Sequence, residues 1–363
     1  MELLSAAAQA VRSALPVSWS ITEDLELAIK GASLGPPDAL LTIVAPDGRS
    51  AALVIESRST VSPRDVASVA AQLDAYRDKA EREGRVIGGA MVAAPFVSPT
   101  TRAQLEQRGL GWFDSTGNLR LRLDEPAVFL DRAGADRSGF RDPADRLLKS
   151  LRGPAAAKVV LELCETSLPV GVRELAERAQ VGLGTSARVL ELLDRETAVE
   201  RGEDGAVTSV RKRVLVDRWT QDYRVTASNE VIATLDPRGL DHALKALPSV
   251  GSRVVVTGSA ATRAYLPKGT TPVSPLVSLS LYAEDPIGLI GGLGLRKVER
   301  GMNVLVMRPY DVVVLARSRT VDGVRYAAPG QVVADLLTGP GRSGEEAEQL
   351  MTALESREQG WER

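Results

Sequence analysis

The chain has 363 residues, of which 44% are hydrophobic and 25% are charged, and its formal net charge is -2. This length predicts two or three domains with ordinary cores, and the near-neutral charge excludes a broadly basic surface for nucleic acid. The single cysteine excludes an internal disulfide and a thiolate metal cluster within the chain, and the single histidine, His242, argues against a His-based zinc site and a Ser-His triad. No apolar run approaches the ~20 residues that span a bilayer, and the start of the chain lacks the pattern of a signal peptide. We therefore expect a cytoplasmic protein without a membrane partner.

An alternation of helices and strands characterises residues 1–135. The apolar run at 86–96 is continuous, which is typical of a central strand covered on both faces. The pattern predicts helices at 2–15, 63–84 and 99–108, and strands at 37–48, 49–59, 86–96, 111–114 and 118–123. We expect an α/β domain over residues 1–135.

Five polar residues stand at intervals along these elements: Asp38, Glu56, Arg58, Gln72 and Tyr76. Their order and spacing resemble the motif of the restriction-endonuclease-like fold, particularly its RecB-type branch. The resemblance implies that Asp38 and Glu56 hold Mg²⁺ on a phosphodiester while a lysine positions the attacking water. An upstream acid is expected from one of three residues, namely Glu23, Asp24 or Glu26.

Arg58 stands where this family has lysine. Arginine stays protonated at ordinary pH, so it cannot act as a general base, although it can clamp a phosphate. Each residue also has a plain structural interpretation: solvated carboxylates at strand ends, an ion pair of Arg58 with Glu56 or Asp38, and packing of Tyr76 on a helix face. We expect a nuclease-like domain that does not cleave, and a Mg²⁺-dependent nuclease is the alternative.

A turn and a linker are expected after this motif. The stretch from Gly109 to Asn118 resembles the tail of nuclease-like domains in bacterial DNA-binding regulators, and its Asp-Ser-Thr-Gly-Asn sequence is typical of a turn between strands. Residues 131–145 are rich in Gly, Asp and Arg, which indicates an exposed connection. The cations within this connection or just after it form either a solvated face or an arm that contacts phosphate. They are Arg137, Arg141, Arg146, Lys149 and Arg152.

Three short helical patterns and a hairpin occupy residues 136–224. Apolar residues at i, i+3 and i+4 predict buried faces, with Cys164 as a small core residue. The third helix is expected to begin at Thr185 or Ser186 and to leave Ser186, Arg188 and Arg195 in solvent. The hairpin turns at 203–205, and its returning strand is predicted to carry Arg211, Lys212 and Arg213.

This pattern resembles a winged helix-turn-helix domain. The resemblance implies that the third helix lies in the major groove and that the wing contacts the DNA backbone, with Arg188 reaching guanine edges. Many winged helices mediate protein contacts instead. The expected DNA-contacting residues are Thr185, Ser186, Arg188, Arg201, Arg211, Lys212 and Arg213.

The pattern of residues 225–363 predicts strands and helices around a strand-to-helix turn at Gly258 and Ser259. Strands are expected in 271–285 and 297–318, and helices in 326–337 and 343–358. The pattern resembles the nucleotidyltransferase-like domain of AbiEi-type antitoxins. Active members need two carboxylates on the next strand, where this chain has Ser278 and Ser280. We expect a tight turn and no catalysis there.

The sequence thus predicts an α/β (α+β) multi-domain bacterial protein: a restriction-endonuclease-like domain at 1–135, a winged helix at 136–224 and a nucleotidyltransferase-like domain at 225–363. The expected function is a sequence-specific transcriptional regulator that binds double-stranded DNA at the nucleoid, with a homodimer and a partner protein left open. The alternatives are a Mg²⁺-dependent nuclease, an antitoxin of an AbiEi-type pair and a scaffold. No cofactor is expected unless Mg²⁺ serves the nuclease.

Overall fold

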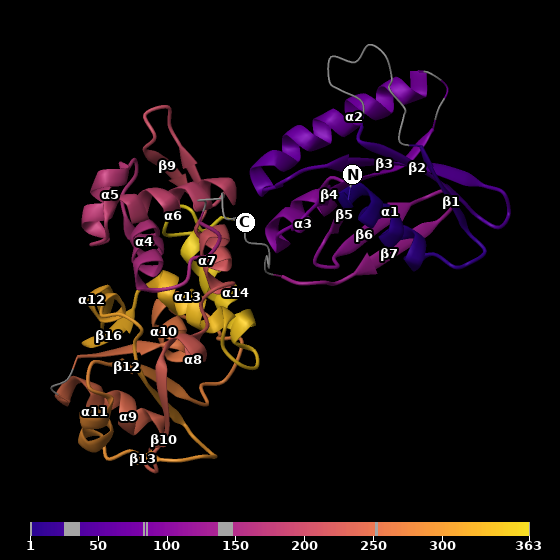
Figure 1. Ribbon diagram of the computed structural model, residues 1–363. Helices are drawn as coiled ribbons and strands as arrows, with labels where there is room; N and C mark the ends of the chain where they lie inside the picture. The colour runs from indigo at the N-terminus through magenta and orange to yellow at the C-terminus, as the bar shows by residue number, and fades with distance from the viewer. Residues whose placement is uncertain are drawn as a thin grey trace. The chain divides into compact units, whose positions relative to one another are not determined.

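The computed structural model is a mixed α/β protein that divides into two compact units, Met1–Arg146 and Leu147–Arg363 (Figure 1). It describes residues 2–24, 37–82, 84, 86–136, 148–250 and 253–362, without the side chains at 23 and 24. Each unit contains one seven-stranded sheet with helices packed against it. Among the described residues, no helix is long and apolar enough to cross a membrane.

The sheet of the first unit follows the chain order from β1 to β7. Strands β3, β4 and β5 run parallel to one another, and the remaining neighbours pair antiparallel. The strands are β1 Ser20–Asp24, β2 Ala39–Val44, β3 Ser50–Ser57, β4 Ile87–Ala94, β5 Gly111–Asp114, β6 Leu119–Leu123 and β7 Val128–Arg132. The helices are α1 Glu2–Ala14, the 3-10 turn η1 Pro63–Asp65, α2 Val66–Arg82 and α3 Pro99–Gln107.

Two hydrophobic layers cover the two faces of this sheet. Met91 and Ala93 of β4 pack with α1, whereas Val92 and Ala94 pack with α2. Alternate side chains of a strand point to opposite faces, so a strand covered on both sides must be apolar throughout. This accounts for the continuous apolar run in β4, and the expected central strand is confirmed.

The turn between β5 and β6 has the polar chemistry expected from its sequence. The buried Asp114 carboxylate accepts hydrogen bonds from the backbone N of Thr116 at 2.9 Å and from Nδ2 of Asn118 at 2.9 Å. Gly117 has φ 103°, which favours glycine. The expected linker begins later than predicted, because 131–132 belong to β7, and Arg137, Arg141 and Arg146 lie outside the described residues.

The second unit begins with three helices and a hairpin, here called the helix–hairpin module: α4 Pro154–Glu165, α5 Val172–Arg178, α6 Leu183–Arg195, β8 Val199–Arg201 and β9 Val207–Val210. The three expected helices and the expected turn at 203–205 are present. The returning strand ends at Val210, however, and helix α7 Lys212–Thr220 follows. The prediction that Arg211, Lys212 and Arg213 lie on the returning strand is therefore wrong.

The second sheet has the order β13-β10-β14-β12-β11-β16-β15. Its strands are β10 Glu230–Leu235, β11 Val254–Thr257, β12 Leu279–Ala283, β13 Arg296–Lys297, β14 Val304–Arg308, β15 Ser318–Val321 and β16 Val324–Ala327. The accompanying helices are α8 Val225–Ser228, α9 Leu240–Ala246, η2 Leu247–Ser249, α10 Gly258–Tyr265, α11 Pro286–Gly292, α12 Val313–Ala316, α13 Pro329–Leu337 and α14 Ser343–Glu355. The apolar run at 312–316 had suggested a strand and forms α12 instead, because periodicity does not distinguish so short a run.

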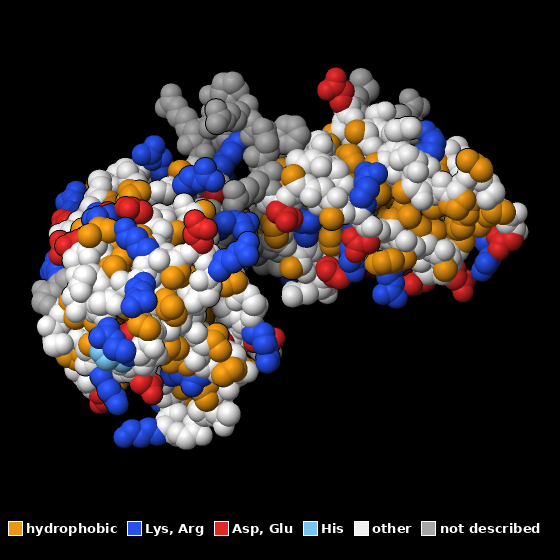
Figure 2. Space-filling view, turned by 90° about the horizontal axis from the view of Figure 1, so that it is seen from below, with side chains coloured by type: hydrophobic (Ala, Val, Ile, Leu, Met, Phe, Trp, Pro, Cys, Tyr) orange, Lys and Arg blue, Asp and Glu red, His pale blue; other side chains and the backbone are white. Residues whose placement is uncertain are grey.

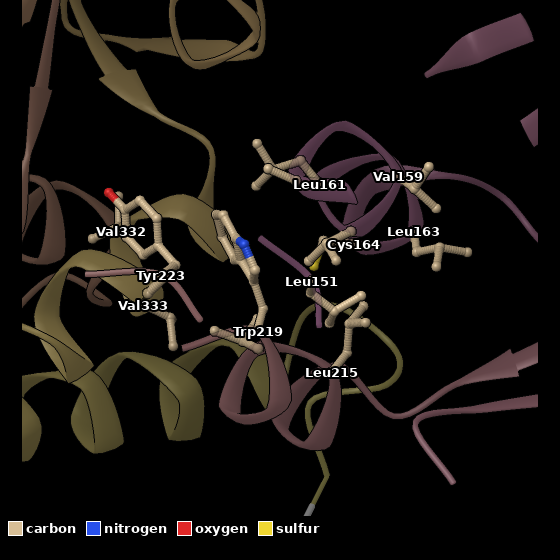
Figure 3. Close-up of a cluster of buried hydrophobic side chains, with 14 of the residues drawn as sticks. Leu151, Val159, Leu161, Leu163, Cys164, Leu215, Trp219, Tyr223, Val332 and Val333 are labelled. Atoms are coloured by element: carbon tan, nitrogen blue, oxygen red, sulfur yellow. The ribbon is translucent and has the colours of Figure 1, made fainter. Parts of the chain in front are cut away.

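One hydrophobic core joins the helix–hairpin module to the second sheet. Trp219 and Tyr223, at and after the end of α7, lie between Leu161 of α4 and Val332 and Val333 of α13 (Figure 3). Trp219 and Tyr223 stack with ring centroids 4.7 Å apart. The segments 136–224 and 225–363, expected as separate domains, therefore share one core within a single compact unit.

A buried polar network reinforces this junction. The Asp335 carboxylate of α13 accepts hydrogen bonds from Tyr223 Oη at 2.7 Å, Gln331 Nε2 at 2.8 Å and Thr257 Oγ1 at 2.5 Å. Burial raises the pKa of Asp335 to about 6, although these donors favour the charged form. Because buried polar groups are costly without partners, the network fixes α13 relative to the residues after α7.

Candidate functional site

Helix α6 presents one apolar face and one solvent-exposed face. Val189, Leu190 and Leu193 are buried, whereas Gly184 and Arg188 are exposed, as are Leu183, Ala187 and Glu191. The helix begins after Gly182, whose extended backbone (φ -65°, ψ 142°) occupies the N-cap position. The predicted caps, Thr185 and Ser186, are therefore inside the first turns of the helix.

The α6 side chains that were expected in solvent or in contact with DNA differ in exposure. Ser186 is fully buried, because it lies three and four residues before Val189 and Leu190 on the inward face, and its Oγ has no hydrogen-bond partner in the described structure. Thr185 is half-buried. Arg195 is half-buried and donates from Nη2 to Leu148 O at 2.7 Å. The expectation that Ser186 and Arg195 are available to solvent is wrong, and Arg188 alone of the three expected side chains is exposed.

The hairpin keeps two of its four expected cations at the surface. Arg201 is exposed and donates from Nε to Gly205 O at 3.0 Å. Arg211, just after β9, is exposed and lies 3.5 Å from Thr197 O through Nη1. Both guanidiniums make only weak local contacts, so they remain able to reach a phosphate.

Lys212 and Arg213 belong to the interior of the second unit. Arg213 is buried and donates from Nε to Trp361 O at 2.6 Å and from Nη1 to Glu348 at 2.9 Å. The backbone N of Lys212 donates to Gly360 O at 2.6 Å, and its ammonium lies 5.8 Å from the Trp361 ring centroid. The C-terminal tail therefore covers both cations, and the structure does not place them on the exposed surface of the hairpin.

The exposed charges of the helix–hairpin module nearly cancel. Arg188, Arg201 and Arg211 are accompanied by Arg173 and Arg178 on α5, and Arg178 is paired with Glu174. The exposed acids of the same elements are Glu174, Glu177, Glu191, Glu200, Glu203 and Asp204. Any polyanion bound here must be held by a few placed arginines, because the module has no excess of positive charge.

The first unit brings together Asp38, Glu56, Arg58 and Gln72 of the nuclease-like residues. Gln72 Nε2 donates to Glu56 Oε1 at 3.1 Å, and Arg58 Nη2 lies 3.1 Å from that oxygen and 2.6 Å from Gln72 Oε1. Asp38, just before β2, accepts the backbone N–H of Ser57 at 2.8 Å. Tyr76 packs against the core beneath α2. The spacing in the sequence thus corresponds to a real cluster, which Ser57 joins through its backbone.

Electrostatics in this cluster are governed by the buried Glu56. Burial raises the pKa of Glu56, and the charge of Asp38 raises it further, while Arg58 and Gln72 act in the opposite direction. The three candidates for an upstream acid cannot be placed in this cluster, because the side chains of Glu23 and Asp24 and all of Glu26 lie outside the described residues.

One oxygen of each carboxylate in this cluster already has a protein partner. Magnesium prefers carboxylate oxygens open to a compact octahedral shell, whereas Oε1 of Glu56 contacts the Arg58 guanidinium. One oxygen of Asp38 is taken by the backbone of β3. Within the described ranges, no three Asp, Glu, His or Cys side chains gather as metal ligands.

At the start of α10, the strand-to-helix turn is closed by protein groups. Gly258 has φ 64°, and Ser259 Oγ donates to Glu346 at 2.5 Å. Ser280 of β12 pairs with Thr257 at the end of β11. Asp285 caps α11 by accepting from Gly288 N at 3.0 Å. The geometry fits a structural turn.

Sequence reasoning missed a polar cluster at the end of β10. The buried Asp236 carboxylate contacts His242 Nδ1 at 2.8 Å and Arg238 Nε at 3.1 Å. The only local signal is the Asp-Pro-Arg-Gly turn at 236–239, since six residues separate the acid from the histidine.

Comparisons with family models, with curated proteins and with solved structures give no match for this chain. Its function is therefore argued from its own residues.

Proposed function

We propose that the protein is a sequence-specific DNA-binding regulator in which the helix–hairpin module is a winged helix-turn-helix domain and α6 enters the major groove. The solvent-facing side of α6 carries this proposal. Gly184 and Ala187 are small and exposed, so they allow the helix backbone to approach base edges. The exposed Arg188, which follows Ala187, can then reach a guanine.

The contact set is narrower than the sequence suggests. Arg188 supplies base readout, while Arg201 and Arg211 at the two ends of the hairpin supply phosphate contacts. The acidic residues at 200, 203 and 204 repel a second phosphate strand, which lowers affinity for arbitrary DNA. Specific contacts, rather than charge, would therefore dominate recognition.

The other regions fit the proposal as folded platforms. The order of strands and the cluster around Glu56 support a degenerate restriction-endonuclease-like first unit, because Arg58 takes the lysine position and closes the carboxylate. The turn at Gly258 and Ser280 of β12 support an inactive nucleotidyltransferase-like sheet. A bacterial regulator acting at the nucleoid in the cytoplasm, as a monomer or a homodimer, is consistent with these features.

Selection of bound fragments from genomic DNA, followed by fluorescence anisotropy on the selected duplex, tests this function. Two phosphate-contacting arginines predict a shallow salt dependence, with a slope of log affinity against log salt of about -2. Arg188→Ala should weaken binding to the selected site by about tenfold or more while leaving binding to scrambled DNA nearly unchanged.

Two controls separate the contact from general effects. Ser186→Ala changes a residue of the same helix that is buried. Arg342→Ala removes an exposed arginine just before α14, where it pairs with Glu345. Both variants should bind as the wild type does. The proposal fails if no sequence is enriched, or if Arg188→Ala has the same affinity and footprint as these controls.

A further inference from the structure

At one corner of the second sheet, outside the helix–hairpin module, polar and positively charged side chains form an ordered cluster. Asp236 follows directly after β10, and its side chain is completely buried. The backbone on either side is fixed, because Asp236 N donates to Asn303 Oδ1 at 2.7 Å and Asn303 Nδ2 donates to Asp236 O at 2.9 Å. The carboxylate is therefore held rigidly in place.

This carboxylate orients an arginine and a histidine side chain that both reach the surface. Its Oδ2 lies 2.8 Å from His242 Nδ1, and its Oδ1 lies 3.1 Å from Arg238 Nε and 2.9 Å from the Arg238 backbone N. The side chain of His242 is 36% exposed and that of Arg238 is 49% exposed. Since Asp236 uses Nδ1, the imidazole has Nε2 left to meet a ligand.

Arg238 is also positioned from its other side. Its Nη2 donates to the carbonyl oxygen of Leu293, and a Cβ on the adjacent Gly294 would come within 3.2 Å of that nitrogen. A glycine at 294 thus leaves room for the guanidinium to lie flat against the loop. Such positioning reduces the conformational entropy that a charged side chain loses when it binds a ligand.

Further positive charge surrounds this pair. Thr234, two residues before Asp236, pairs with Lys297 of the short edge strand β13, and Lys297 is exposed. Lys245 is exposed one helical turn after His242 on α9. Figure 2 shows Lys and Arg side chains around the single histidine of the chain. The nearby exposed acids are Asp241 and Glu299, fewer than the cations.

We infer that the corner formed by His242, Arg238 and Lys297 is a binding site for a phosphate group. A buried carboxylate that presents a histidine and an arginine to solvent, with a lysine beside them, supplies directed donors and net positive charge to a compact anion. The hydrogen bonds from Arg238 and His242 outweigh burial and hold the pKa of Asp236 below its usual value, so the carboxylate remains ionised. This site is independent of the proposed DNA contact on α6.

The single histidine provides a direct assay. In full-length protein labelled with ¹³C-histidine, the Cε1–H signal of the one histidine ring is followed during titration with pyrophosphate, at constant neutral pH and with ionic strength balanced by sodium chloride. The wild type should show a saturable shift. Lys297→Gln should weaken the apparent affinity by about tenfold, because one charged donor is lost.

Two further variants complete the design. Lys268→Gln removes an exposed lysine elsewhere in the same unit and should titrate as the wild type does. His242→Gln, followed by calorimetry, should bind pyrophosphate more weakly than the wild type. A shift that does not saturate, or equal affinity for Lys297→Gln and Lys268→Gln, would overturn the inference.

The source of the phosphate is resolved in the same experiment. A short duplex lacking the selected operator is added to the pyrophosphate-bound protein. Displacement of pyrophosphate, with return of the histidine signal, identifies the phosphate as that of a nucleic-acid backbone. Retention of pyrophosphate identifies a small phosphorylated ligand.

Discussion

Arg58 shows how a single side chain sets the chemistry of a cluster. Its guanidinium bridges the Glu56 carboxylate and the Gln72 amide, with Nη2 at 3.1 Å and 2.6 Å from their oxygens. A fixed positive charge there replaces the charge that a metal ion would supply and also repels such an ion. Arginine cannot lose its proton, so this state persists over all ordinary pH values.

Arg58→Ala should therefore create a weak Mn²⁺ site where the wild type has none. Removing the guanidinium exposes Glu56 next to Asp38, and Mn²⁺ affinity measured by electron paramagnetic resonance should rise by about tenfold or more. The gain should disappear in Arg58→Ala/Glu56→Gln, and Arg122→Ala, which removes an exposed arginine of the same unit, should show no gain. Equal Mn²⁺ binding by the wild type and Arg58→Ala would contradict this account.

Asp335 predicts a pH dependence of stability. Its pKa is about 6 in the folded protein, where burial raises it, against the ordinary value of 3.8. A raised folded-state pKa contributes stability that is fully present below 3.8 and is lost as the pH rises through about 6. The advantage of wild type over Asp335→Asn in unfolding free energy should thus shrink by about 3 kcal/mol between these limits.

Denaturant unfolding of wild type and Asp335→Asn at several pH values measures this difference. Asp217, whose pKa burial also raises to about 6, contributes equally to both proteins and cancels. An advantage that stays constant or grows with pH would show that Asp335 is charged at no cost in the folded protein.

At the scale of elements, sequence periodicity predicted most of what is buried. The apolar faces of α4 and α6 and the central strand β4 follow from spacing alone, because each buries a regular stripe or run. The boundary between β9 and α7 did not follow, because Arg211-Lys212-Arg213 is compatible with a strand or a helix. What decides it is Trp361, roughly 150 residues away, whose carbonyl accepts from Arg213. The cluster of Asp236 and His242 was missed for a similar reason, since only the fold brings its loop beside β13.

Arg213→Ala distinguishes an interior role from a DNA contact. It leaves Trp361 O without its donor and frees Glu348, so the unfolding free energy should fall by about 2 kcal/mol. The affinity of the folded fraction for the selected duplex should be unchanged, whereas Arg211→Ala should weaken binding and leave the melting temperature nearly unchanged. Thermal unfolding and anisotropy on the same samples separate these effects, and a stable Arg213→Ala with lost DNA binding would restore the original wing assignment.

For the molecule as a whole, the shared core makes the helix–hairpin module and the second sheet one cooperative unit. Leu215 of α7 is completely buried in that core, on the side of Leu151 and of Leu163 and Cys164 of α4 (Figure 3). Truncating a buried leucine to alanine removes transfer free energy and leaves a cavity, at a cost of about 2 to 5 kcal/mol. Because α7 contacts both the helix–hairpin module and the helices packed on the second sheet, the loss of stability should extend to both.

Leu215→Ala should lower hydrogen-exchange protection in β8 and β9 and in β11 and β12 by the same free energy. The slowest-exchanging amides of β3 and β4, which belong to the separate first unit, should keep their wild-type protection. Leu53→Ala, in the core of the first unit, is the matched control and should give the opposite pattern. If Leu215→Ala weakens the hairpin while β11 and β12 stay protected, the module unfolds alone, and DNA binding by α6 is then thermodynamically independent of the sheet that carries His242.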